Sequence, residues 1–326
     1  MTLNEITIEV TQQCPNHCIY CSSLSDLEKT EALVFETICK VVDDAKILGA
    51  KSVSLSGGEP FLRADIAEIV DYIYAHGIGV KVYSSGIYCA NGQYSSIPVS
   101  LLNAVNDKID ALIFNYEAID ADQYASIVGT KPSNIAFLEE SIKNAIALGI
   151  PVEAHLVPMH CNYREIPGVL NKLFLMGVKS VSFLRLVPQG RALENKELVD
   201  LCTDEKKELQ QILSKSEEIY KDKIRLGLPF SAKHGACATG IVKLTVRYDG
   251  FVFPCEAFKD GVIGIVENIT PENVKEKSLI DIYENSAYLR RVRDGLNTYL
   301  KSNSNERCFG QYCRLEKKKL CNCDLI

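Results

Sequence analysis

The stretch "TQQCPNHCIYCSS", residues 11–23, carries Cys14, Cys18 and Cys21 in the spacing C-x3-C-x2-C. A closed structural metal site takes four ligands, so three thiolates on a short loop leave one coordination position free. His17 lies inside the loop and cannot easily reach the same metal. The spacing alone is consistent with an iron–sulfur cluster that has one open iron, and also with a zinc ion that takes a distant fourth ligand.

Length, composition and charge narrow the class of protein. The chain has 326 residues, which suits a barrel-sized domain with an appendage, and its net charge of -6 argues against a broad nucleic-acid surface. Its beginning, "MTLNEITIEV", lacks the pattern of a signal peptide, and no apolar stretch is long enough to span a membrane. Thirteen cysteines in such a chain point to metal or redox chemistry in a reducing compartment. We therefore expect a cytoplasmic protein without nucleic-acid or membrane partners.

Strand-like and helix-like segments alternate through the first two thirds of the chain. Strands are predicted at 5–11, 52–56, 79–85, 110–116, 151–157 and 180–187. Helices are predicted at 34–50, 64–76, 99–107, 134–148, 165–176 and 204–219. Such units give parallel strands with right-handed crossovers, in either an open sheet or a partial barrel. Both architectures gather functional groups at the carboxyl ends of the strands, where the cysteine loop and the following "GGEP" and "SSG" lie.

The pattern changes after residue 222. Residues 241–254 predict a hairpin that turns at Asp249-Gly250, and residues 279–295 predict an amphipathic helix. The tail has little regular pattern and four cysteines. We place a boundary near 222–236 and expect an α/β domain at 1–222 followed by a small α+β domain at 223–326.

A second motif, "SLSGGEP" at 54–60, ends the second predicted strand. Alone it would be an ordinary Gly-Gly turn, in which the glycines allow a close approach of the backbone. Behind C-x3-C-x2-C, it strongly resembles the radical S-adenosylmethionine (radical SAM) superfamily. The resemblance implies a partial (β/α)6 TIM-type barrel over about residues 1–200. It also implies a [4Fe–4S] cluster whose open iron binds S-adenosylmethionine, reductive cleavage to a 5′-deoxyadenosyl radical, and abstraction of a hydrogen atom from a substrate.

The resemblance also assigns residues to the binding of S-adenosylmethionine. Cys14, Cys18 and Cys21 would hold the cluster. The positions that match contacts to the methionyl group, adenine and ribose are Tyr20, Gly57, Gly58, Glu59, Pro60, Ser84, Ser85, Asn115 and Glu117. Where an arginine commonly follows in this family, the chain has Val128.

The C-terminal cysteines form a second group. Cys237, Gly250 and Cys255 are spaced C-x12-G-x4-C, and the tail adds Cys308, Cys313, Cys321 and Cys323. Incidental buried cysteines are a poor explanation for so many. The arrangement resembles the SPASM and Twitch extensions of radical SAM enzymes, although the tail spacing C-x4-C-x7-C-x-C differs from theirs. We expect at least one auxiliary [4Fe–4S] cluster, held by Cys237, Cys255 and two of the tail cysteines; two clusters and a structural zinc remain alternatives.

The resemblance implies a radical reaction and indicates its substrate class. Enzymes with such extensions most often modify ribosomally made peptides, by cross-linking or epimerisation. The alternative is dehydrogenation or rearrangement of a small molecule such as a sugar or nucleoside. A non-catalytic iron–sulfur protein would need neither "GGEP" nor a barrel. We expect a reductant such as flavodoxin or ferredoxin. Because 13 residues precede Cys14, we expect no leader-binding domain before the cysteine loop. Either a separate protein supplies one, or the tail contacts the substrate, or the substrate is small.

Two further cysteines follow strands on the expected catalytic face. Cys89 comes after the third predicted strand and Cys161 after the fifth. A thiol there could donate a hydrogen atom to a substrate radical, so both are candidate catalytic residues. An inert loop cysteine is the simpler interpretation of each, because only exposed and activated thiols react. His155, inside the fifth strand, is interpreted as a packed or adenine-flanking residue rather than a base.

Overall fold

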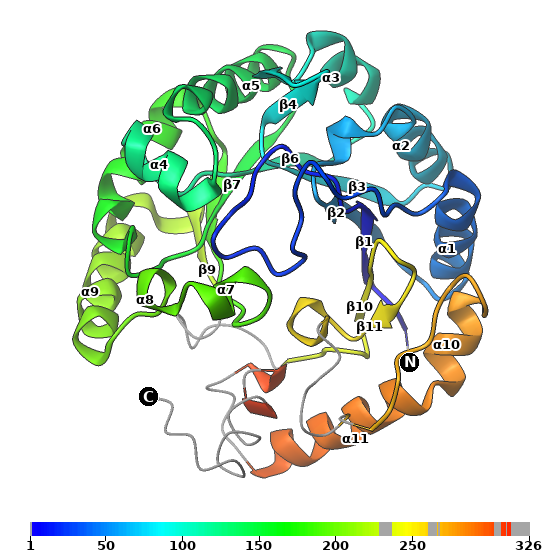
Figure 1. Cartoon of the computed structure of the whole chain (residues 1–326). Coiled ribbons are helices and arrows are strands. Elements are labelled where there is room, and N and C mark those ends of the chain that lie inside the picture. Colours follow the sequence, from blue (N-terminus) through cyan, green and yellow to red (C-terminus); the bar gives the residue numbers. More distant parts are fainter. Residues whose placement is uncertain are drawn as a thin grey trace.

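The structure is a computed structural model that describes residues 2–227, 237–259, 266, 268–302, 308–310 and 312–313. Its centre is one nine-stranded sheet with the strand order β11-β10-β1-β2-β3-β6-β7-β8-β9. All neighbouring strands from β10 to β9 are parallel, and only β11 is antiparallel. The strands form a curved inner layer, and the helices form a ring outside it (Figure 1). The predicted partial (β/α) barrel is therefore confirmed.

The elements of the fold have the following bounds. The strands are β1 (Glu5–Thr11), β2 (Ser52–Gly57), β3 (Gly79–Ser84), β4 (Ile87–Ala90), β5 (Gln93–Ser96), β6 (Ala111–Asn115), β7 (Val152–Leu156), β8 (Ser180–Phe183), β9 (Ile224–Leu226), β10 (Lys243–Val246) and β11 (Val252–Phe253). The α-helices are α1 (Phe35–Ile47), α2 (Ile66–Ala75), α3 (Val99–Val105), α4 (Ala121–Val128), α5 (Ile135–Ala147), α6 (Ile166–Met176), α7 (Arg191–Glu194), α8 (Lys196–Val199), α9 (Thr203–Tyr220), α10 (Leu279–Asn285) and α11 (Ala287–Ser302). The 3-10 turns are η1 (Pro60–Leu62), η2 (Pro132–Asn134), η3 (Tyr163–Glu165), η4 (Lys221–Lys223) and η5 (Glu256–Phe258).

The barrel has an apolar outer layer and a polar inner face. Ile6, Ile8 and Val10 alternate along β1 and are fully buried in the core that the helices complete. Because side chains alternate along a strand, Thr7 and Glu9 point to the opposite face, which is the inside of the barrel. The inner face can therefore place polar groups beside a substrate.

The hairpin predicted at 241–254 is present, but it extends the barrel. Strands β10 and β11 pair as an antiparallel hairpin, and β10 also pairs in parallel with β1. Strand β9 adds to the other edge beside β8. The strands β9, β10 and β11, which follow residue 222, belong to the same sheet as the strands before it. The proposed boundary at residues 222/223 stays a prediction.

Three local features differ from the sequence-based expectation. The hairpin of β4 and β5 and the short helix α4 were not predicted. The single helix expected at 279–295 is two helices, α10 and α11, which are separated at Ser286. Ser286 has extended ψ and its hydroxyl accepts a hydrogen bond from the Leu289 amide at 3.0 Å, so it caps a new helix instead of continuing the first.

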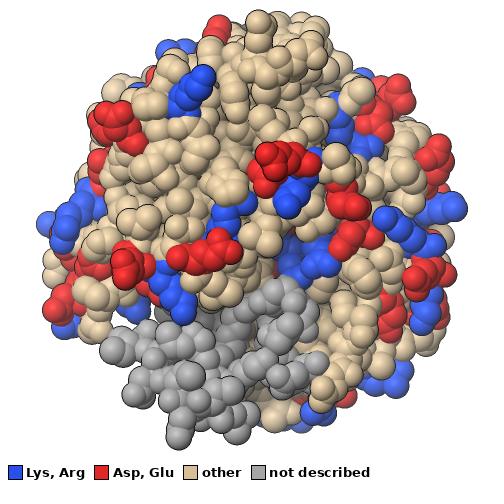
Figure 2. Space-filling view, in the orientation of Figure 1, with Lys and Arg blue, Asp and Glu red and all other residues tan. Residues whose placement is uncertain are grey.

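The surface carries both signs of charge. On the face shown in Figure 2, acidic and basic side chains are intermixed. Among the described residues, no helix is both long enough and apolar enough to cross a bilayer.

Candidate active site

The three-cysteine loop follows β1 at the carboxyl end of the barrel and crosses its mouth (Figure 1). Its backbone is held from several sides. The Cys14 amide donates to the Asp26 carbonyl at 3.0 Å, and the Cys21 amide donates to the Cys18 carbonyl at 3.1 Å. At the end of α4, the Val128 carbonyl accepts from the His17 amide at 2.9 Å. The position where the family commonly has an arginine therefore supports the loop through its backbone in this chain.

The three thiols lie close enough for the charge of one to affect the pKa of another. Burial raises the pKa of Cys14, and the neighbouring charges of Cys18 and Glu59 raise it further. Burial likewise raises the pKa of Cys18, followed by the charge of Cys21. Metal ligands must be deprotonated, so iron binding at these thiols would release protons. The loop thus gathers three soft sulfur donors of the kind that iron–sulfur clusters use.

The "GGEP" segment packs directly on this loop. Its backbone donates from Gly58 to Thr11 at 2.6 Å and from Glu59 to Gln13 at 2.7 Å. A Cβ atom at Gly58 would lie 2.0 Å from the Gln13 carbonyl oxygen, and one at Gly57 would lie 2.2 Å from that of Thr11. The glycines were expected to allow a ligand to approach the backbone. In the structure they allow the backbone of the cysteine loop to approach the "GGEP" backbone. Each motif therefore fixes the backbone position of the other.

Glu59 joins the ends of β2 and β3. It is fully buried, and its carboxylate accepts hydrogen bonds from the Ser84 hydroxyl at 2.9 Å and from the Ser85 amide and hydroxyl at 2.6 Å each. Burial raises the pKa of Glu59, and these hydrogen bonds oppose that shift. The three side chains expected near S-adenosylmethionine therefore do come together. Their polar groups bind one another and hold the segment's backbone in place.

Tyr20, Asn115 and Glu117 also come together, at the ends of the cysteine loop and of β6. The Tyr20 hydroxyl donates to Glu117 Oε1 at 2.6 Å, and the Val157 amide donates to Glu117 Oε2 at 3.0 Å. Asn115 Nδ2 lies 3.4 Å from the Tyr20 oxygen. Burial raises the pKa of Glu117 to about 7, although the hydrogen bonds from Tyr20 and Val157 lower it. A buried carboxyl group whose pKa is raised toward neutrality is typical of a functional site.

Arg191 is a site residue that the sequence patterns did not single out. It is 4% exposed, and its Nε donates to the Cys18 carbonyl at 2.7 Å while its NH2 donates to the Ser25 carbonyl at 2.7 Å. Its backbone amide also donates to the Cys21 carbonyl at 3.1 Å. Arg191 lies in the segment "RLVPQGRA" at 185–192, and no local pattern in this segment links the arginine to a loop so distant in sequence.

Several C-terminal cysteines also converge. Burial raises the pKa of Cys255 to about 11, and the charges of Cys308 and Cys237 add to that shift. Cys313 is buried, and Gly310 lies against the turn after Cys255, since its Cβ would be 2.7 Å from that of Ala257. Cys321 and Cys323 lie outside the described residues.

Comparison with known proteins gives the family. The sequence profile of the Radical SAM superfamily matches residues 8–173, which include the cysteine loop and "GGEP". The chain belongs to this superfamily.

Two relatives and one solved structure extend the likeness. PqqA peptide cyclase of Methylobacterium sp. (strain 4-46) is 28% identical over 292 residues, which is 87% of this chain and 74% of the relative. GTP 3',8-cyclase of Marinobacter nauticus is 25% identical over 267 residues, which is 76% of this chain and 77% of the relative. The crystal structure of Streptococcus suis SuiB bound to precursor peptide SuiA has a TM-score of 0.72 at 16% identity, covering 96% of this chain and 76% of SuiB. The shared fold includes the C-terminal part.

Membership of the radical SAM superfamily implies an enzyme that uses a [4Fe–4S] cluster and S-adenosylmethionine. The donor set of the loop fits such a cluster, because it supplies three cysteines and leaves one iron open. Over the described parts of the chain, no three His, Cys, Asp or Glu side chains lie together as ligands of a single metal ion do. In a cube of four irons the thiolates bind separate irons, so they need not approach as closely as ligands of one ion.

The two candidate catalytic cysteines occupy different settings. Cys161 is half-buried after β7, where burial raises the pKa of its thiol to about 11 and the charge of Glu117 also raises it. Its thiol therefore keeps its hydrogen at neutral pH and lies near the Tyr20–Glu117 contact. Cys89 lies on β4 opposite Tyr94 of β5.

His155 lies on the inner face of the barrel, with its ring centroid 5.2 Å from that of Tyr83. Burial lowers the pKa of His155 to about 4, and the charges of Arg225, Lys243 and Lys81 lower it further. The imidazole is therefore neutral at physiological pH. This agrees with its interpretation as a packed residue.

The lowered pKa of His155 predicts a pH dependence of stability. The unfolded chain takes up the histidine proton near pH 6.5, before the folded chain does, so stability is lost as pH falls from there toward about 4. Between about pH 7.5 and pH 5, the free energy of unfolding should fall by ~2 kcal/mol more in the wild type than in His155→Phe. Anaerobic urea unfolding followed by circular dichroism would measure this. The same pH dependence in both proteins would contradict a buried neutral histidine.

Proposed function

We propose that this radical SAM enzyme abstracts a hydrogen atom from a ribosomally made peptide. The observation that carries the proposal is the similarity to PqqA peptide cyclase, which covers 87% of this chain and so extends well beyond the superfamily match at 8–173. The likeness to SuiB, solved with its precursor peptide SuiA, supports it at the level of the fold.

In this proposal the cysteine loop holds the SAM-binding cluster. Cys14, Cys18 and Cys21 would be its ligands, and the cluster with bound S-adenosylmethionine would supply a 5′-deoxyadenosyl radical. The backbone of Gly57, Gly58, Glu59 and Pro60, fixed by Ser84 and Ser85, would hold the methionyl group. Tyr20, Asn115 and Glu117 would contact the nucleoside. The partly buried Tyr20–Glu117 hydrogen bond supports this placement, because it pre-orders polar groups beside the cysteine loop.

We further propose an auxiliary [4Fe–4S] cluster at the C-terminal cysteines. Burial raises the pKa values of Cys237 and Cys255, and the charge of Cys308 raises both further, which supports a shared site; buried Cys313 is the fourth candidate ligand. Cys321 and Cys323 remain further candidates from the sequence. Residues 1–222 would then form the catalytic barrel and 223–326 the auxiliary segment. Thiolate-rich sites of this kind suit a reducing cytoplasm, where flavodoxin or ferredoxin would serve as the reductant and a separate protein would bind any leader peptide.

Cys161 is the candidate hydrogen donor. Its thiol stays protonated, as such a donor requires, and lies near Glu117 at the end of β6. Donation would break the S–H bond, form a C–H bond at the substrate radical, and leave sulfur one electron and one proton short. The reductant would restore the electron and solvent the proton. Cys89 is the second candidate.

Peptide substrates can be tested with the reduced enzyme and S-adenosylmethionine in deuterium oxide. Short peptides encoded beside the gene should increase 5′-deoxyadenosine formation and undergo a mass change, whereas GTP should do neither. If Cys161 donates hydrogen, solvent deuterium appears at a peptide Cα, and Cys161→Ala stops that incorporation while 5′-deoxyadenosine still forms. Cys202→Ala, at an exposed cysteine that precedes α9, is the matched control and should leave the product unchanged.

A small-molecule substrate is the second candidate, favoured by the similarity to GTP 3',8-cyclase. Modification of GTP, or of a sugar or another nucleoside, without modification of any peptide would replace the peptide proposal by this one.

A further inference from the structure

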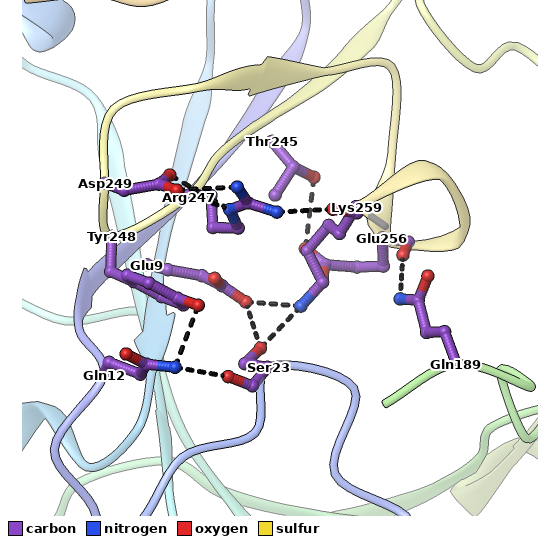
Figure 3. Close-up of polar contacts among 10 residues, drawn as sticks. All are labelled: Glu9, Gln12, Ser23, Gln189, Thr245, Arg247, Tyr248, Asp249, Glu256 and Lys259. Carbon is purple, nitrogen blue, oxygen red and sulfur yellow. Dashed lines mark hydrogen bonds and ion pairs between the residues drawn. The ribbon is translucent and has the colours of Figure 1, made fainter. Parts of the chain in front are cut away.

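A buried ion pair joins the turn after Cys255 to the cysteine loop. Lys259 Nζ forms an ion pair with Glu9 Oε1 of β1 and donates to the Ser23 hydroxyl at 2.8 Å. The Ser23 hydroxyl in turn donates to Glu9 Oε1 at 2.7 Å. Lys259 also pairs with Glu256 at 2.7 Å. Figure 3 shows these side chains reaching toward one another from the C-terminal turn, from β1 and from the loop.

The Lys259–Glu9 pair and Ser23 are enclosed by protein. Lys259 is 4% exposed, Glu9 is 2% exposed and Ser23 is 8% exposed. Burial alone would lower the pKa of Lys259, but the carboxylates of Glu256 and Glu9 outweigh it and hold the pKa above its usual value. Lys259 therefore carries a fixed positive charge. Buried charges are screened by salt much less than surface charges, so salt weakens the field of this pair only a little.

Neighbouring hydrogen bonds hold the pair in one geometry. Gln12 Nε2 donates to the Ser23 carbonyl at 2.9 Å and to the Tyr248 hydroxyl at 2.9 Å, which links the loop to the β10–β11 hairpin. Gln189 Nε2 donates to the Glu256 carbonyl at 2.7 Å (Figure 3). The turn and the loop cannot move independently without breaking these contacts.

The pair lies very near the proposed cluster ligands. Ser23 follows Cys21 by two residues, so their Cα atoms are at most ~7 Å apart. Reduction potentials of iron–sulfur clusters depend on the surrounding charge and hydrogen bonds. A fixed positive charge stabilises the reduced, more negative cluster, whereas a fixed carboxylate opposes reduction.

We propose that Lys259 and Glu9 are positioning residues that set the charge beside the cysteine loop and thereby the reduction potential of the cluster that this loop binds. This inference rests on the proposed assignment of that cluster to Cys14, Cys18 and Cys21, and not on the class of substrate. It predicts that replacing Lys259 and replacing Glu9 shift the reduction potential in opposite directions. A purely structural role of the ion pair does not predict opposite shifts.

The test is a redox titration of the purified enzyme, followed by the electron paramagnetic resonance signal that changes when S-adenosylmethionine is added. Lys259→Met should lower the reduction potential by at least ~59 mV, which corresponds to a tenfold change in the equilibrium constant of a one-electron reduction. Glu9→Gln, which is nearly isosteric, should raise it by a similar amount. The double variant should lie between the two. Iron and sulfide per chain would verify that each variant is loaded.

Lys172 and Glu139 provide a matched control, because they form a lysine–glutamate pair on the outer helices α6 and α5. Lys172→Met and Glu139→Gln should leave the potential unchanged. Shifts in the same direction for Lys259→Met and Glu9→Gln, or unchanged potentials with iron retained, would overturn the inference and leave the proposed function standing. Opposite shifts in an enzyme that modifies only GTP would uphold the inference and contradict the peptide proposal.

Discussion

Alanine in place of Cys14, Cys18 or Cys21 is expected to reduce 5′-deoxyadenosine formation below detection. Three thiolates already leave one iron open, so each loss leaves a cluster with only two protein ligands. The change also removes a thiol from a loop that is otherwise rigidly held, so a neighbouring residue cannot replace it. The measurement is anaerobic reduction with dithionite, addition of S-adenosylmethionine and chromatography of the products.

Cys39→Ala is the control for this experiment, because Cys39 is a half-buried cysteine of α1 rather than of the cysteine loop. It should retain the cluster and full cleavage of S-adenosylmethionine. Full activity in any one of the three loop variants would contradict the assignment of that cysteine as a ligand.

Much of the barrel was predictable because its strands and helices carry local patterns. The β1 segment was predicted at 5–11 and is observed at Glu5–Thr11, since Ile6, Ile8 and Val10 alternate with polar residues. Long amphipathic helices such as α5 and α9 were likewise expected within a residue or two of their observed bounds. Short elements were not, because α4 and the β4–β5 hairpin contain too few residues to show a period.

The pairing of β10 with β1 had no local signal. The hairpin turn at Asp249-Gly250 was visible in the sequence, but its partner strand lies more than two hundred residues earlier. Parallel pairing is decided by which sheet edge remains available after the barrel has formed, and a sequence pattern does not report that.

The candidate site was predictable where a motif defines it. The cysteine loop and "GGEP" carry such motifs and pack on each other, and Tyr20 of the loop donates a hydrogen bond to Glu117. Arg191 and Lys259, which bind the loop through its carbonyls and through Ser23, were missed. Each acts across a sequence separation of more than a hundred residues, and a single arginine or lysine carries no spacing from which to infer a partner.

The second large effect concerns the auxiliary site. A variant with Cys14, Cys18 and Cys21 all replaced by alanine should still bind iron and sulfide, because Cys237, Cys255, Cys308 and Cys313 remain. One cube corresponds to about four irons per chain. The physical reason is the convergence of Cys237, Cys255 and Cys308. Burial raises the pKa values of Cys237 and Cys255, the charge of Cys308 raises both further, and a cluster would bind these sulfur atoms as thiolates. Metal analysis and the visible absorbance of the purified protein would measure it.

Further replacement of Cys237 and Cys255 by alanine in that variant should remove the remaining iron. Its matched comparison carries Cys39→Ala and Cys202→Ala instead, two cysteines outside both groups, and should keep about four irons. Zinc in place of iron would show a structural metal site, and iron near zero in the triple variant would rule out an auxiliary cluster. About eight irons would instead require two clusters with open or non-cysteine positions, because six C-terminal cysteines cannot supply the eight thiolates that two fully cysteine-bound cubes need.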